Sequence, residues 1–197
     1  MKMKQIIMFL LVLTVTSCGY LENQEAERKE KEQIALEQRR LKQKLIQDSI
    51  RIQDSIKIEI EEKKKEERIL EIKNSLSNIS FSLSSSNSVG GRDVTFYYTN
   101  KSPKTIKYLV WGGRFKNAVG DFVGCTAREY TTYRGQDTGP VKTNHRGGGY
   151  WETVIYNYSA RKMLVYEIRI DYMDGSKLKI TGEELKLIGL KDSQIVI

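Results

Sequence analysis

The chain has 197 residues, a net charge of +8 at pH 7, two cysteines and one histidine. Two cysteines exclude a disulfide-rich scaffold and a cysteine-based zinc site. We therefore expect neither a bound metal nor another cofactor.

The first 17 residues have the pattern of a secretory signal peptide. Lys2 and Lys4 precede an apolar run from Ile6 to Leu13, and small residues follow it. The run has about half of the roughly 20 residues that a transmembrane helix needs. We expect residues 1–17 to be cleaved rather than to remain as a membrane span.

The segment Val15-Thr16-Ser17-Cys18 resembles the lipobox of bacterial lipoproteins. The resemblance implies that signal peptidase II cuts before Cys18, that palmitate-type chains diacylate its thiol, and that its new amine is acylated. Several acyl chains hold a protein firmly at a membrane, at about 0.8 kcal/mol per buried CH₂. Residues 18–21 would then be the lipid attachment. The alternative is an ordinary cleaved signal in which the cysteine is incidental.

Position 19 bears on which membrane is used. In bacteria with two membranes, an aspartate after the lipidated cysteine resembles the inner-membrane retention signal. This chain has Gly19 there. The resemblance therefore favours the outer membrane over the inner one, with the mature domain in the periplasm or at the cell surface.

Residues 22–77 are predicted to form a charged helical stalk. They lack proline and glycine, and they carry 14 basic and 14 acidic residues. Six apolar residues lie in one narrow stripe at 100° per residue: Ile34, Leu41, Leu45, Ile52, Ile56 and Leu70. Some of their spacings are seven and four, as in a coiled coil, but an eleven-residue step interrupts the heptad.

Two interpretations of the stalk stay open. The helix pairs with other copies as a coiled coil, or it is a single helix supported by ion pairs four residues apart, such as Glu27 with Lys31. In either case about 55 helical residues would span about 80 Å. A rod of that length between a lipid and a folded domain would act as a spacer.

Residues 78–197 are predicted to form a β-sandwich domain. Alternating β-branched and aromatic residues, with turn signals between them, predict strands at 79–84, 93–99, 105–115, 121–127, 139–143, 150–157, 163–172 and 177–181. Asn100 to Pro103 predicts a turn, and Asp174-Gly175 predicts a tight hairpin. The expected fold is an all-β antiparallel, immunoglobulin-like sandwich preceded by a long helix.

Several segments of this domain resemble the immunoglobulin-like domains of bacterial cell-envelope proteins, of the FxLYD-like type. These are Val94 to Tyr108, Asn117 to Asp121, Thr138 to Pro140, and Tyr172 to Ser176. The resemblance covers residues 90–180. It implies a sandwich fold and no catalytic residues.

Other candidates for chemistry have simpler explanations. His145 is expected to be a solvent-facing loop residue, because no nucleophile or carboxylate is adjacent to it in sequence. Gly147 to Gly149 lacks the context of a phosphate loop and is expected to be a flexible or bulged strand entry. The Asp-Gly turn explains Asp174 without a metal ion. Cys125 is expected to be buried and inert.

A contact surface is predicted around the loop Arg128 to Arg134 and the pair Tyr150-Trp151. Tyr, Trp and Arg dominate interaction hot spots, so the candidate residues are Tyr130, Tyr133, Arg134, Tyr150 and Trp151. The alternative is that these aromatics belong to the sandwich core. The basic domain allows an envelope protein or a polyanion as partner, whereas the expected compartment excludes nucleic acid.

These observations predict a non-enzymatic envelope lipoprotein in which a helical spacer presents a β-sandwich binding module. A second hypothesis is a structural or assembly subunit that oligomerises through the helix. A third is a hydrolase with an unrecognised site, for which His145 would be the residue to test.

Overall fold

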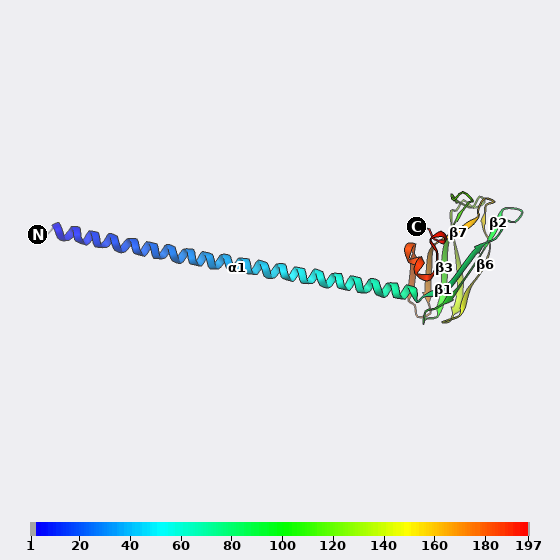
Figure 1. Ribbon diagram of the computed structural model, residues 1–197, viewed down its shortest axis with the longest axis horizontal. Coiled ribbons are helices and arrows are strands. Elements are labelled where there is room, and N and C mark those ends of the chain that lie inside the picture. The colour runs from blue at the N-terminus through cyan, green and yellow to red at the C-terminus, as the bar shows by residue number, and fades with distance from the viewer. Residues whose placement is uncertain (1–2, 197) are drawn as a thin grey trace. The chain divides into compact units, whose positions relative to one another are not determined.

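The computed structural model describes the backbone of residues 3–196 and the side chains of residues 24–196. One helix, α1 (Met3–Lys73), precedes eight strands and two short 3₁₀ helices (Figure 1). The chain divides into two units, Met1–Glu62 and Lys63–Ile197. The side chain of Cys18 lies outside the described residues, so its predicted lipidation stays a prediction.

The first unit is helical from residue 3 onward. Every side chain from 24 to 62 is exposed, including those of Ile34, Leu41 and Ile52, which are 49%, 61% and 60% exposed. Lys29 lies 3.4 Å from Glu25, four residues away on the same face. The predicted long helix is therefore confirmed, and its apolar stripe is uncovered in the single chain. Among the described residues, no helix is long and apolar enough to cross a membrane.

The last turns of α1 belong to the second unit. Ile72 is fully buried in the core, and the Ser75 hydroxyl donates to the Ile72 carbonyl at 2.7 Å. The helix ends at Lys73, four residues before the predicted end at 77, because the chain turns there and enters the first strand at Leu76.

Two antiparallel sheets form the sandwich. The three-stranded sheet has the order β1 (Leu76–Leu83), β2 (Gly91–Asn100), β6 (Arg146–Tyr156). The five-stranded sheet is built on β3 (Ile106–Lys116), which pairs with β4 (Phe122–Val123), β5 (Thr132–Val141) and β7 (Lys162–Tyr172), and β7 pairs with β8 (Lys177–Thr181). The strands are thus divided between two antiparallel sheets, as in an immunoglobulin-like sandwich.

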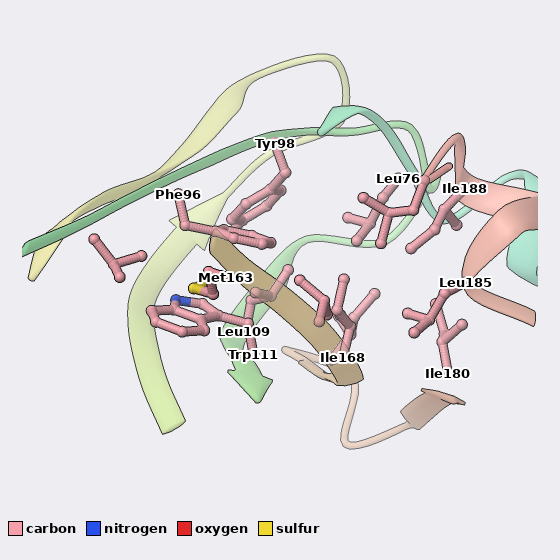
Figure 2. Close-up of a cluster of buried hydrophobic side chains, with 14 of the residues drawn as sticks. Leu76, Phe96, Tyr98, Leu109, Trp111, Met163, Ile168, Ile180, Leu185 and Ile188 are labelled. Carbon is pink, nitrogen blue, oxygen red and sulfur yellow. The ribbon is translucent and has the colours of Figure 1, made fainter. Parts of the chain in front are cut away.

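The core lies between the sheets, and Trp111 of β3 is its largest fully buried side chain (Figure 2). Its indole is fully buried, stacks on the ring of Phe96 at 5.6 Å, and contacts the ring of Trp151 edge-on at 5.2 Å. In antibody domains a core tryptophan packs against a disulfide, whereas Trp111 packs against aromatic rings.

The helix end and the C-terminal segment close one end of the core. The helix η1 (Gly182–Ile188) brings Leu185 and Ile188 to the same cluster as Leu76 (Figure 2). After η2 (Asp192–Gln194), Ile195 forms a parallel bridge with Val165 of β7. Backbone from both termini of the domain therefore covers apolar side chains that the sheets leave open.

Both predicted turns are present, but four residues, 173–176, join β7 to β8 where Asp174-Gly175 predicted a two-residue hairpin. Gly175 adopts a φ of 85° between β7 and β8, and its N–H donates to the Tyr172 carbonyl at 3.1 Å. Asn100 is fully buried, and its amide nitrogen donates to the carbonyls of Lys104 and Val141, each at 2.9 Å. The Asn100 side chain thus stabilises the turn that follows β2.

Two strand predictions were wrong in extent. The predicted strand 121–127 is reduced to β4, Phe122–Val123, and the predicted strand 139–143 is the end of a longer strand, β5, which begins at Thr132. Gly135 and Asp137 interrupt the alternation of apolar and polar residues in β5, so the sequence does not indicate a strand there. A Cβ atom at Gly135 would lie 2.4 Å from the Trp111 indole, so packing against that ring requires glycine there.

Candidate functional site

Three of the predicted contact residues lie at or near the core tryptophan. Tyr133 on β5 lies 5.7 Å from Trp111, Trp151 lies 5.2 Å from it, and Tyr130 lies 6.3 Å from Tyr133. All three are half-buried and pack against the core. The Tyr130 hydroxyl donates to the Val154 carbonyl. These rings form one partly exposed aromatic cluster that links β5 to β6.

The other two predicted residues point elsewhere. Tyr150 is 55% exposed, and its hydroxyl donates to the Asp93 carboxylate at 2.5 Å. Arg134 lies on the outer face of β5, because strand neighbours alternate by face. The five residues therefore do not form one surface, and their binding role stays a prediction.

The loop and strand around His145 contain no catalytic arrangement among the described residues. His145 is exposed, as predicted, and its Nδ1 lies 2.9 Å from the Thr143 carbonyl. Gly147 to Gly149 do not form a loop but belong to β6 and pair with β2. A Cβ at Gly148 would lie 2.1 Å from the Phe96 carbonyl oxygen, so the glycines permit a close strand approach.

Cys125 is buried, as predicted, although it lies in a loop rather than a strand. Burial raises the pKa of its thiol, but hydrogen bonds from the N–H of Tyr156 and of Ala127 more than offset this, so the pKa lies below its ordinary value. Burial and the neighbouring thiol raise the pKa of Tyr130 to about 12. The Cys125 sulfur thus acts as a hydrogen-bond acceptor next to Tyr130.

Asp137 connects the two sheets at this edge. Its Oδ2 accepts hydrogen bonds from the Tyr98 hydroxyl and from the Gly148 N–H, both at 2.8 Å. Burial, and then the bond to Asp137, raise the pKa of Tyr98 far above its ordinary value. This carboxylate thus links β5 of one sheet to β2 and β6 of the other.

The outer face of the five-stranded sheet carries many charged side chains. Alternation places basic side chains from four neighbouring strands on this face. They are Arg114, Lys116, Arg134, Arg169, Lys177 and Lys179. The Arg114 guanidinium lies 3.8 Å from the centroid of the Phe122 ring, which lies along the same face. We call this surface the basic sheet face.

Glu167 lies at the centre of the basic sheet face. Its side chain is only 7% exposed, and three cations surround it: Lys179 at 3.0 Å, Arg169 at 3.2 Å and Arg134 at 3.5 Å. Within the described part of the chain, its Oε1 receives no hydrogen bond despite the two nearby guanidinium groups. The buried carboxylate is therefore compensated by three cations whose side chains are about half exposed.

A groove of about 320 Å³ runs beside this carboxylate. Tyr108, Val110 and Gln136 line one side of it. Arg169, Lys179 and the pair formed by Lys177 with Asp171, at 3.3 Å, line the other. The groove thus combines one aromatic ring, one amide and one carboxylate with three cations. Such a mixture suits a polar, negatively charged ligand.

The comparisons with known proteins add no identification. No family model matches the chain, and neither curated proteins nor solved structures match it significantly. Among the described residues, no group of three or more His, Cys, Asp or Glu side chains is placed to hold a metal ion.

None of the residues that line the groove was among the predicted contact residues. They come from β3, from β5 and from the β7–β8 hairpin, which are distant from one another in sequence. Their common face depends on strand order and register, and neither can be read from alternation alone. The available signal was the run of basic residues at alternate positions in β8, Lys177 and Lys179.

Proposed function

We propose that this chain is a non-enzymatic cell-envelope lipoprotein, anchored through acyl chains on Cys18, in which a helical spacer presents the β-sandwich as a binding module. The observation that carries the proposal is the lipobox-like segment Val15 to Cys18 directly before a long charged helix. The outer membrane is the favoured location, since Gly19 follows the cysteine.

The second unit supports the binding part of this proposal. A sandwich without a catalytic arrangement among its described residues, but with a strongly basic face and a groove, has the features of a recognition domain. Its partner would be an envelope protein or a polyanion. The sequence offers His145 as the residue to test for enzymatic activity, and among the described residues it is exposed next to a turn.

Cell fractionation tests the anchor. Tagged wild-type protein is expected in the membrane fraction and Cys18→Ser in the soluble fraction, because only the former carries acyl chains. Cys125→Ser is the matched control and is expected to stay with the membrane. Equal membrane retention of Cys18→Ser and wild type would contradict the proposal.

A second candidate function, oligomeric assembly through a coiled coil, is favoured by the uncovered stripe on α1. Leu41, Leu45, Ile52 and Ile56 are each more than half exposed, and they follow coiled-coil spacing over part of their length. Sedimentation of the detergent-solubilised full chain distinguishes the candidates. A dimer or trimer that Leu45→Ser with Ile52→Ser converts to monomer supports assembly, whereas a wild-type monomer excludes it.

A further inference from the structure

The groove on the basic sheet face has cations in excess, and most of them remain available to a ligand. Lys177, Lys179 and Arg169 have side chains 73%, 62% and 44% exposed. The nearly buried Glu167 carboxylate contacts Lys179 and Arg169, and Asp171 contacts Lys177, so each cation has a partner that leaves much of its side chain exposed. Cations that are already positioned lose less conformational freedom when an anion binds.

The groove also carries a carboxylate that faces the ligand space. Asp171 lines it and is part of the Lys177 pair. A bare inorganic anion would meet repulsion from this group, whereas a ligand with hydroxyl donors would satisfy it. The Gln136 amide both donates and accepts hydrogen bonds, which also suits hydroxyl groups.

The volume of the groove and the Tyr108 ring restrict the class of ligand further. About 320 Å³ is near the lower end of ligand-binding volumes, so the groove receives a short segment rather than a folded protein. Tyr108 lines the groove, and an aromatic ring offers a surface on which the apolar face of a sugar can pack. Hydroxyl groups, a negative charge and a packing face occur together in sugars that carry carboxylate groups.

We propose that this groove binds a short segment of an acidic glycan. Its carboxylate lies between Lys177, Lys179 and Arg169, while its hydroxyl groups contact Gln136 and Asp171. The proposal rests on the proposed function only for the compartment in which such a glycan is met. The binding chemistry depends on the domain alone.

Binding of a fluorescent oligogalacturonate to detergent-solubilised full-length protein tests this assignment. Wild type is expected to bind it, and a neutral cello-oligosaccharide of equal length is expected not to. Lys177→Gln with Lys179→Gln should weaken binding at least about fivefold, since each exposed charge contributes modestly and the two act together. Higher salt should weaken binding by the wild type.

The matched control is Lys101→Gln with Lys142→Gln, which removes the same charge from exposed positions that do not line the groove. This variant should bind within about twofold of wild type. An equal loss in both double variants would mean nonspecific charge attraction and would overturn the assignment. Absence of wild-type binding, or equal binding of the neutral oligosaccharide, would overturn it too. Thermal melts of each variant confirm that it is folded, and the fractionation experiment above is unaffected by either result.

Discussion

Trp111 and Gly135 show how single residues determine the shape of the candidate site. The indole fills the centre of the sandwich, and β5 passes so close to it that a side chain at position 135 has no room. This contact sets the position of β5, and β5 in turn carries Tyr133 to the aromatic cluster and Arg134 to the basic sheet face. The glycine thus affects the position of two candidate surfaces through one packing contact.

Gly135→Ala is expected to lower the free energy of unfolding by about 2–3 kcal/mol, because its Cβ would lie 2.4 Å from the buried indole. Gly149→Ala is the control, since its Cβ would meet only Trp151, at 3.9 Å. That variant should change the free energy of unfolding by less than about 0.5 kcal/mol. Urea denaturation followed by tryptophan fluorescence measures both. Equal stability of the two variants would contradict this account of β5.

At the scale of elements, the end of α1 is joined to the domain by a polar contact as well as by Ile72. The Arg68 guanidinium donates to both oxygens of Glu184, at 2.7 and 2.9 Å, and to the Lys179 carbonyl at 3.0 Å. The hydrogen bond with Arg68 is the main cause that lowers the pKa of Glu184. The contact joins α1, β8 and η1, and it lies next to a lysine of the groove.

Glu184→Gln is expected to destabilise the domain by at most about 1 kcal/mol at pH 7, because the pair is half-exposed and screened by water. The pKa of this group is lower in the folded state, so its contribution is present above the unfolded value of about 4.3 and is lost as pH falls through the folded value. The difference between wild type and Glu184→Gln should therefore shrink as the pH falls below about 4.3. Urea denaturation at pH 7 and pH 3 measures it.

Glu66→Gln, on an exposed position of the same helix, is the control for this prediction and should leave stability unchanged at both pH values. A stability difference between wild type and Glu184→Gln that persisted undiminished at pH 3 would show that the carboxylate charge is not responsible.

The elements also show what the sequence could predict. The long helix, most of the strands and the Asp-Gly hairpin follow from local composition and alternation, since these depend on neighbouring residues. β5 was largely missed because its glycine serves a contact with a distant tryptophan. The basic sheet face was missed because Arg134, Glu167 and Lys179 meet only through strand order and register.

At the scale of the whole molecule, the account joins three parts with different physical roles. Acyl chains would supply membrane attachment, a charge-balanced helix would supply separation, and the β-sandwich would supply recognition. The helix buries no side chain between residues 24 and 71, so the single chain gives it no packing partner there. Spacing and self-association are the two roles that this exposure allows, and sedimentation distinguishes them.

The anchor at Cys18 is the central claim, because the location, the spacer role and the source of the ligand all depend on it. Intact-mass and N-terminal peptide mass spectrometry of the protein purified from membranes tests it most directly. The account predicts a mature chain that begins at Cys18 and carries acyl chains on both its thiol and its amine. A mature N-terminus elsewhere, or a Cys18 with a free thiol, would contradict it.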